Sequence, residues 1–331
     1  MSIFSQPKLH PLPAGINLSG RFAIITGASS GLGLEAARQL LILKISTVIL
    51  AVRNPSKAET CISSLRTDPE IKKNNPQAEI KTMKVDMDDP HSVVKFTETV
   101  IAEVPRVDYL ILNAGFAPFK FETSPSGHES SIQVNYLSNV LLLAKILPHL
   151  EASAEKTGQP SRISWVGSRR HESPSWASKK PVKKDESILK YMDDPKNFDF
   201  TTKYGDSKTL CAMFLYQLAL KLNTEKIIFN MMCPGMVTTA MGSDMPLPIR
   251  IYISVLRAIK SRPVEEGAWV LLHAALVADS STHGRFLTDM DATPKAPYLA
   301  SAAGQEFSKK LWNETMDDVK QYTSLPPAFI S

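Results

Sequence analysis

The chain has 331 residues and a net charge of +5, with 43% hydrophobic and 21% charged residues. This composition belongs to a globular protein with enough apolar residues for a core, and it excludes a disordered or fibrous chain. Basic residues are spread along the sequence apart from one run at 179–184, which favours a solvated loop over a nucleic-acid-binding patch.

Strand-like and helix-like segments alternate after an extension over residues 1–19, which lacks the apolar segment of a secretory signal. Short apolar runs predict strands at 22–26, 47–52, 79–85, 107–112, 161–167, 226–232 and 283–287. Helical spacing predicts helices near 32–44, 56–66, 90–103, 128–152, 203–224 and 263–278. This alternation is typical of parallel βαβ units. We therefore expect one Rossmann-type α/β domain over 20–331, doubly wound, with helices on both faces of a parallel sheet.

Two long segments interrupt this alternation. Residues 169–202 are polar, and residues 240–262 are rich in Met, Pro and Ile. Because loops of this length in a compact domain are often functional, we interpret 240–262 as a substrate lid and 169–202 as a second covering loop. A tolerated surface insertion is the alternative for 169–202. Six apolar residues favour an adaptable substrate pocket, with ordinary core as the alternative: Met236, Met241, Met245, Leu247, Ile249 and Trp176.

Cysteines, histidines and apolar runs exclude further classes of protein. Cys61, Cys211 and Cys233 fit no disulfide framework. Neither they nor the seven histidines have the spacing of metal ligands, so we expect no metal and a reducing, cytoplasmic compartment. The longest apolar run, 137–150, is shorter than the roughly 18 residues of a spanning helix, and we expect no membrane span.

A glycine-rich turn at 26–33 follows the first strand and precedes a helix. In such a turn Gly27 allows the tight bend, Gly31 lets backbone N–H groups approach phosphates, and Gly33 lets the helix pack on the sheet. The helix N-terminus then offers unpaired N–H groups and the positive end of its dipole to a pyrophosphate. We therefore predict a dinucleotide site, with a purely structural turn as the alternative. The glycine spacing differs from the commoner G-x-G-x-x-G.

Ligands of an open parallel sheet bind at the carboxyl ends of its strands, so the residues after each strand are the next candidates. Arg53 follows the second strand, where an acidic residue would hold a ribose 2′-hydroxyl; a guanidinium suits a 2′-phosphate and favours NADP(H) over NAD(H). The alternative is a solvent-facing arginine. Asp86 is a candidate to bind the adenine amino group, or to cap the helix that begins near Pro90. Residues 113–115 are small and would let the backbone lie close to a cofactor, or form a plain turn.

The fifth strand ends at Ser168, and the helix over 203–224 opens with Tyr204 and, four residues later, Lys208. Positions i and i+4 share a helical face, so the phenol and the ammonium project together. A nearby cation lowers the pKa of a phenol from its usual value of about 10, and such a phenol can exchange a proton with a carbonyl oxygen. Ser168 would donate a hydrogen bond to the same oxygen. Asn135 either holds a water that links Lys208 to solvent or ties its helix to backbone.

Together these residues resemble the short-chain dehydrogenase/reductase family. The matches follow the family order over residues 20–290 and comprise the turn at 26–33, Asp86, Asn113-Ala114-Gly115, Asn135, Ser168, Tyr204, Lys208 and Cys233-Pro234-Gly235. The stretches 49–54 and 265–268 resemble the retinol-dehydrogenase-like branch, and the general pattern is similar to fungal pathway reductases. The resemblance implies a seven-stranded sheet of order 3-2-1-4-5-6-7 and an active site of Ser168, Tyr204, Lys208 and Asn135.

The resemblance also implies the cofactor contacts, the reaction and the assembly. The cofactor-binding residues are expected to be Gly27, Ser29, Ser30, Gly31, Leu32, Gly33, Arg53, Asn54, Asp86, Met87, Asn113, Ala114, Gly115, Tyr204, Lys208, Pro234, Gly235, Val237 and Thr239. We expect hydride transfer between NADP(H) and a lipophilic ketone or secondary alcohol, with Tyr204 as general acid/base, in secondary metabolism. The alternative is a non-redox protein on this scaffold, either a cofactor-binding sensor or a cyclase that uses the cofactor structurally. Family members often dimerise through the helices at 128–152 and 203–224, which makes a homodimer a further expectation.

Two features depart from the family pattern. Ser168 and Tyr204 are 36 positions apart, which is longer than the usual spacing. Gly167 stands where a serine is common in the retinol-type branch. Neither departure removes a residue of the expected active site.

Overall fold

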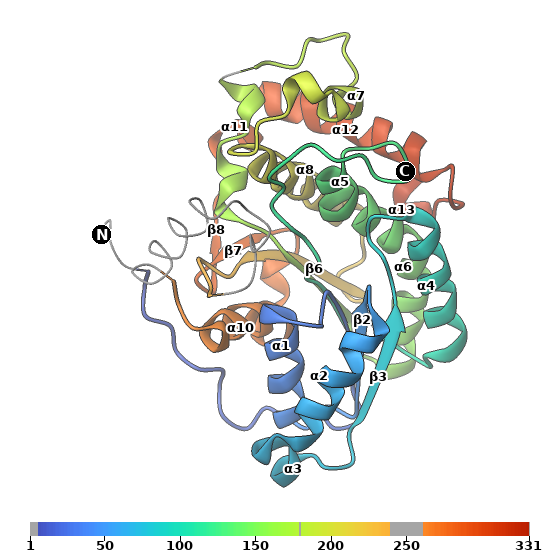
Figure 1. Cartoon of the computed structure of the whole chain (residues 1–331), viewed down its shortest axis with the longest axis vertical. Coiled ribbons are helices and arrows are strands. Elements are labelled where there is room, and N and C mark those ends of the chain that lie inside the picture. The colour runs from blue at the N-terminus through green and yellow to red at the C-terminus, as the bar shows by residue number, and fades with distance from the viewer. Residues whose placement is uncertain (1–5, 179, 239–260, 331) are drawn as a thin grey trace.

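The computed structural model describes residues 6–178, 180–238 and 261–330 (Figure 1). Its centre is an eight-stranded sheet of order β3-β2-β1-β4-β5-β6-β7-β8. The strands are β1 (Phe22–Thr26), β2 (Thr47–Val52), β3 (Glu79–Lys84), β4 (Tyr109–Leu112), β5 (Ser161–Val166), β6 (Ile227–Cys233), β7 (Phe286–Thr288) and β8 (Asp291–Thr293). The first seven pair in parallel. The expected single α/β domain architecture and the order of the first seven strands are confirmed.

The eighth strand corrects the expected number of seven. β8 pairs antiparallel with β7 through a tight turn in which Asp289 and Met290 have φ of 51° and 79°. The strand is only three residues long and largely exposed. It carries no apolar run and no alternation, so the sequence holds no strand signal for it.

The six predicted helical segments are present, and further helices that were not predicted join them. They are α1 (Gly31–Ile42), α2 (Pro55–Thr67), α3 (Pro69–Asn74), α4 (Pro90–Glu103), α5 (Ser130–Ile132), the π-helical turn η1 (Gln133–Leu137), α6 (Ser138–Thr157), α7 (Ile188–Asp193), α8 (Lys203–Leu218), α10 (Val264–Leu272), α11 (Pro297–Ala300), α12 (Ala302–Val319) and α13 (Pro327–Ile330). Shorter helical turns are η2 (Arg169–Glu172), η3 (Ser175–Ala177), η4 (Pro195–Asn197), η5 (Ala219–Lys221), η6 (His273–Val277) and η7 (Ser280–Thr282). Proline occupies the first turn of α2, α3 and α4, and Asn54, Asp68 and Asp89 cap them. Both features are typical of helix starts.

Two apolar cores lie on opposite faces of the sheet. Neighbouring residues of one strand point to different cores, as Ile24 and Ile25 show. One core packs under α1, α2 and α10, and the other under α4, α6 and α8 (Figure 1). Among the helices of the described residues, none is long and apolar enough to cross a membrane.

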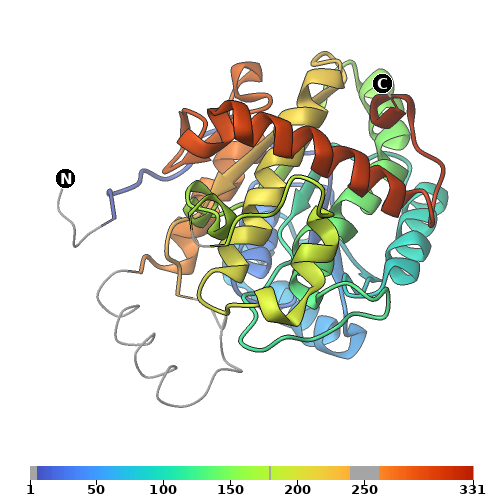
Figure 2. The same cartoon turned by 90° about the horizontal axis from the view of Figure 1, so that it is seen from above.

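The C-terminal segment adds a layer that the sequence analysis did not predict. α12 crosses α8 on the side away from the sheet (Figure 2). The rings of Phe214 on α8 and Trp312 on α12 stack with centroids 5.3 Å apart, and Gln217 Nε2 donates to Ser308 Oγ at 3.1 Å. The face of α8 that looks away from the sheet is therefore covered by the protein's own chain.

The N-terminal extension is also packed. Residues 6–19 contain no helix or strand, yet Leu9 and Leu18 are buried in the core under α1. The segment therefore contributes to the core although it lies outside the sheet.

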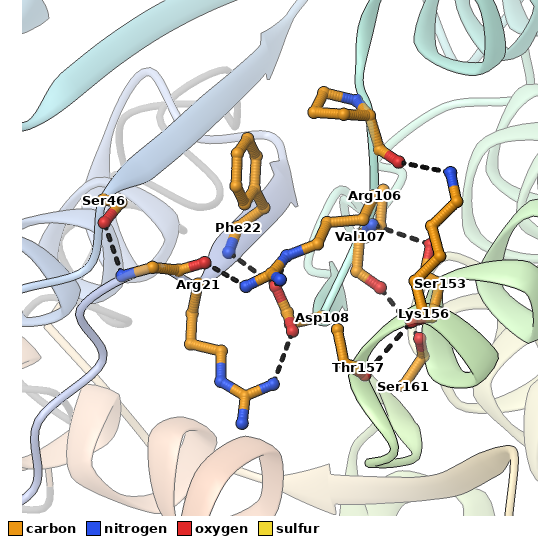
Figure 3. A network of polar contacts seen from close by, with 12 residues as sticks. Arg21, Phe22, Ser46, Arg106, Val107, Asp108, Ser153, Lys156, Thr157 and Ser161 are labelled. Carbon is orange, nitrogen blue, oxygen red and sulfur yellow. Dashed lines mark hydrogen bonds and ion pairs between the residues drawn. The ribbon is translucent and has the colours of Figure 1, made fainter.

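A polar network closes the amino-terminal edge of the sheet (Figure 3). Asp108 accepts from Arg21 Nη1 at 2.7 Å and from the Phe22 backbone N–H at 2.8 Å, which joins the starts of β1 and β4. Ser153 at the end of α6 accepts from the Val107 N–H at 3.0 Å. These contacts lie opposite the carboxyl ends of the strands, so they stabilise the fold and leave the other edge for a ligand.

Candidate active site

The glycine-rich turn has the shape of an anion cradle. Gly27 and Gly31 have φ of 65° and 53°, which favours glycine. A Cβ on Gly33 would lie 2.6 Å from Asn113 Nδ2 and 2.7 Å from the Gly27 oxygen, so α1 approaches the turn as closely as it does only because of this glycine. Ser30 is the N-cap residue of α1, but its side chain makes no capping hydrogen bond, and no acidic residue lies in the first turn. The first backbone N–H groups are thus left for a negatively charged ligand.

The end of β4 is fastened to this turn. Asn113 Nδ2 donates to the backbone oxygens of Thr26 and Gly27 at 2.9 and 3.1 Å. The Thr26 hydroxyl accepts from the N–H groups of Asn113 and Ala114, both at 3.0 Å. Thr26 was not among the expected contacts, and its hydroxyl fixes the two strand ends relative to one another. The Ser29 oxygen accepts from Cys61 Sγ at 3.2 Å, and Leu32 is buried.

The two residues after β2, Arg53 and Asn54, have different roles. The Asn54 side chain caps α2 by accepting from the N–H groups of Ser56 and Lys57 at 3.0 and 3.4 Å. Arg53 is exposed and forms no ion pair with another residue in the described part of the chain. Its guanidinium is therefore available at the carboxyl end of β2.

The residues after β3 lie where expected, with one correction. Asp86 is half-buried, and its carboxylate accepts from the Asp88 N–H at 3.1 Å. The alternative role of Asp86 as the cap of α4 is wrong, because Asp89 caps that helix and accepts from the His91 N–H at 2.9 Å. Met87 is buried, and its backbone oxygen accepts from Ser138 Oγ.

Ser168, Tyr204 and Lys208 come together where β5 meets the start of α8. The Ser168 side chain is hydrogen-bonded to the Tyr204 phenol. Lys208 Nζ lies 5.7 Å from the centroid of the Tyr204 ring and donates to the Val166 oxygen at 2.8 Å. Burial raises the pKa of Tyr204 well above its usual value, and the bond from Ser168 opposes this shift. Burial also lowers the pKa of Lys208.

Asn135 lies in the π-helical turn η1 and ties it to the backbone after β4. Its Oδ1 accepts from the Phe116 N–H at 2.9 Å, and its Nδ2 donates to the Phe116 oxygen and to Ser207 Oγ, both at 2.9 Å. A Cβ on Gly115 would lie 2.9 Å from Asn135 Oδ1 and 3.4 Å from Lys208 Nζ. The side chain therefore has the tying role, and a water link to Lys208 remains a prediction.

The segment after β6 is held by residues that the sequence analysis did not select. Gly235 has φ of 77°. Gln6 accepts from the Met236 N–H at 2.9 Å and donates from Nε2 to the Met236 oxygen at 2.8 Å. Val237 pairs with Arg262, whose Nη2 donates to Asp289 Oδ1 at 2.7 Å.

Part of the expected site lies outside the described residues. Thr239 belongs to that part, as do the lid residues 240–260 with Met241, Met245, Leu247 and Ile249. Pro234 and Gly235 follow directly after β6, at the same edge of the sheet as Ser168.

The described residues of the segment 169–202, which we expect to cover the substrate, are fixed to helices by hydrogen bonds and ring contacts. Asp206 on α8 accepts from the Ser175 N–H and hydroxyl, both at 2.7 Å. Trp176 is buried, and its ring stacks on Phe307 of α12 with centroids 4.9 Å apart. Trp176 is therefore a core residue, which was the alternative to a place in the substrate pocket. Glu314 of α12 accepts from the Ile188 N–H at 3.0 Å and so holds the start of α7.

Gly167 is explained by its surroundings. A Cβ at this position would lie 2.6 Å from Phe286 Cε2 and 2.8 Å from Met231 Cγ. The ring of Phe286 thus occupies the space that a larger residue would need. The departure from the retinol-type pattern is a consequence of packing between β5, β6 and β7.

Known proteins match this chain over nearly its whole length. A family model described as "short chain dehydrogenase" matches residues 21–173. Short chain dehydrogenase yanD of Aspergillus niger is 53% identical over 326 residues, which cover 98% of this chain and 99% of that protein. Short chain dehydrogenase macD of Penicillium terrestre is 51% identical over 321 residues, with 97% of each chain covered.

A solved structure has the same fold. L-sorbose reductase of Gluconobacter frateurii, solved with NADPH and L-sorbose, gives a TM-score of 0.60 at 18% identity and covers 82% of this chain and 96% of its own. At this low identity the likeness shows the fold alone.

Proposed function

The chain belongs to the short-chain dehydrogenase/reductase family, and from this premise we propose that it is an NADP(H)-dependent oxidoreductase acting on a lipophilic ketone or secondary alcohol. One observation carries the proposal: the Ser168 side chain is hydrogen-bonded to the Tyr204 phenol, and the Lys208 ammonium lies beside the Tyr204 ring. A protein that only binds the cofactor has no need of such a proton-transfer set. The non-redox alternative is therefore not favoured by any observation.

The cofactor site proposed here fits a dinucleotide. The cradle at Gly27, Gly31 and Gly33 and the uncapped start of α1 suit a pyrophosphate. The exposed Arg53 suits a 2′-phosphate, which supports NADP(H) over NAD(H). When bound, the nicotinamide cofactor supplies or takes up the hydride.

The residues of the chain move and hold the proton. In the reducing direction the Tyr204 phenol gives its proton to the carbonyl oxygen of the substrate. Ser168 donates a hydrogen bond to the same oxygen and stabilises its developing charge. Burial raises the pKa of Tyr204, so the phenol carries its proton and can donate it. Lys208, fixed by the Val166 oxygen, holds a cation beside the ring.

Four phenylalanine side chains near the proposed active site favour an apolar substrate. Phe119 and Phe121 follow the turn at 113–115, and they meet Phe200 and Phe198, which precede the helix of Tyr204. The ring centroids are 5.2 Å apart in the Phe119–Phe200 pair and 5.8 Å in the Phe121–Phe198 pair. Phe200 is 43% exposed, which is unusual for a large apolar residue and common at binding sites.

A cytoplasmic location and a role in secondary metabolism belong to the same proposal. The three cysteines are free and buried, which suits a reducing compartment. The similarity to fungal dehydrogenases such as yanD and macD supports a pathway role.

The substitution Tyr204→Phe tests the reaction. Purified protein is mixed with NADPH and a panel of aliphatic and aromatic ketones, and NADPH oxidation is followed by absorbance. We expect kcat to fall by at least ~10²-fold in the variant, because the general acid is lost. Tyr216→Phe, a buried tyrosine on the same helix, is the matched control and should keep full activity. Undiminished turnover in Tyr204→Phe would remove the mechanism, and binding of NADPH without any turnover by the unaltered protein would favour the sensor.

A further inference from the structure

His171 lies directly beside the active site and has no role in the mechanism above. It belongs to η2, the short helical turn that follows Ser168, and only 2% of its surface is exposed. Its backbone N–H donates to the Ser168 oxygen at 3.0 Å, and its ring Nδ1 lies 2.8 Å from the same oxygen. A carbonyl oxygen only accepts hydrogen bonds, so Nδ1 must carry the proton. The Ser168 carbonyl is therefore held by two donors from one residue.

Two further contacts fix His171 itself. The His171 and Phe286 rings lie with centroids 4.1 Å apart, so β7 supports the imidazole from one side. The His171 oxygen accepts from Thr209 Oγ1 at 3.1 Å, and Thr209 directly follows Lys208 on α8. His171 is thus held by β7 at its ring, and at its backbone oxygen by the helix that carries Tyr204 and Lys208.

The approach of η2 to α8 depends on Gly205, the residue after Tyr204. A Cβ there would lie 3.0 Å from the Arg170 oxygen and 3.4 Å from Arg170 Cβ. The Ser168 hydroxyl also accepts from the Arg170 N–H at 3.2 Å. Backbone and side chain of Ser168 are both held by η2, which packs on the first turn of α8.

We propose that His171 is a positioning residue that aims the Ser168 hydroxyl at the Tyr204 phenol through its two bonds to the Ser168 carbonyl. This inference rests on the proposed function, because the position of Ser168 matters only if Ser168 binds the reacting oxygen. Burial lowers the pKa of His171, so the ring stays neutral at pH 7 and does not exchange protons with the substrate. Its effect on turnover therefore passes through Ser168.

A double-mutant cycle with the NADPH-loaded protein tests the proposal. We expect His171→Leu to lower kcat by roughly 10- to 100-fold with NADPH affinity unchanged, because small misplacements of a catalytic group have effects of this size. His171→Asn, whose amide can donate from nearly the position of Nδ1, should recover kcat to within about threefold of the unaltered protein. In a Ser168→Ala background, His171→Leu should have no further effect on kcat.

A matched control and a readout without turnover complete the test. His283 also bonds backbone, but far from the site: its Nε2 lies 2.8 Å from the Ala219 oxygen and its Nδ1 accepts from the Phe229 N–H. His283→Leu should lower the melting temperature and leave kcat unchanged. Nuclear magnetic resonance of isotope-labelled histidine should show His171 protonated at Nδ1 and His283 at Nε2.

The outcomes separate this proposal from the proposed function. If the unaltered protein binds NADPH but reduces no ketone, the proposed function fails. If Ser168→Ala and Tyr204→Phe leave turnover intact, the proposed mechanism fails. If those variants are impaired but His171→Leu has the same effect with and without Ser168, or if the His171 proton is found on Nε2, the positioning role is overturned.

Discussion

Arg53 is the residue on which the proposed preference for NADP(H) rests. Its neighbour Asn54 is committed to capping α2, whereas the Arg53 guanidinium is exposed at the carboxyl end of β2. No carboxylate follows β2 at the position where one would hold a ribose hydroxyl. The local chemistry therefore suits a phosphate at this place better than a hydroxyl.

Replacement of Arg53 by alanine should separate the two cofactors. Loss of a charged hydrogen bond weakens binding by about 1.5–3 kcal/mol, so the Kd for NADPH should rise by about 10- to 100-fold while that for NADH changes little. Titration calorimetry with each cofactor measures both values. Arg66→Ala, an exposed arginine near the other end of α2, is the control. Equal weakening of both cofactors would contradict the NADP(H) preference.

How far single residues can be predicted depends on the distance of their partners along the chain. Tyr204 and Lys208 share a helical turn, and Ser168 follows a clear strand, so position alone selects them. The two alternatives for Asn135 could not be separated from the sequence, because its partners Phe116 and Ser207 lie 19 and 72 positions away. Nothing in the sequence indicates that Gln6 lies near the site, because its partner Met236 is 230 positions away.

At the scale of elements, the segment 169–202 is held by side chains from two helices and a loop. Asp206 of α8 accepts hydrogen bonds from Ser175. Glu314 of α12 binds the start of α7, and His128, which precedes α5, binds Asp193 at the end of α7. Strands and long helices were predicted because their apolar periodicity is local. α7 and α12 were not predicted, because α7 is one short turn whose stabilising partners lie elsewhere and α12 buries few apolar residues.

The His128 contacts predict a dependence of stability on pH. His128 Nδ1 lies 2.7 Å from Asp193 and Nε2 lies 3.0 Å from Asp318 of α12. Burial lowers the pKa of His128, but the bonds and charges of the two carboxylates outweigh it and raise the pKa to about 9 from 6.5. A raised folded-state pKa stabilises the protein fully below pH 6.5, and this contribution is lost as the pH rises through about 9.

Urea unfolding across this pH range measures the effect. The free energy of unfolding should fall between pH 6.5 and about 9 in the unaltered protein, by a few kcal/mol at most. His128→Gln should be less stable at pH 6.5 and should lose much less with rising pH. A variant with the same pH slope as the unaltered protein would show that His128 is not responsible.

At the scale of the whole molecule, the C-terminal helices change what the resemblance implies about assembly. The helices expected to form a dimer are α6 and α8, with η1 before them. Trp312 and Phe329 cover Phe214 of α8, and Thr315 Oγ1 lies 2.8 Å from the Tyr136 hydroxyl of η1. On α8 and η1, the surface that would meet a second copy is therefore covered by α12 and α13 (Figure 2).

We therefore predict a monomer in place of the homodimer. Light scattering after size-exclusion chromatography should give the mass of one chain, 36.5 kDa. A protein that lacks residues 302–331 would expose the Phe214 face and should associate or precipitate. A stable dimer mass for the full chain would contradict the prediction.

The contact between Gln6 and Met236 has a practical consequence for any shortened version of this protein. The family match begins at residue 21, and a boundary chosen there would remove Gln6, Leu9 and Leu18 together. The backbone after β6 would lose its hydrogen bonds with the Gln6 amide. The core under α1 would lose two buried leucine side chains. Gln6 thus meets a partner that lies 230 positions later in the chain, and trimming the N-terminal segment would disturb the backbone beside the proposed active site.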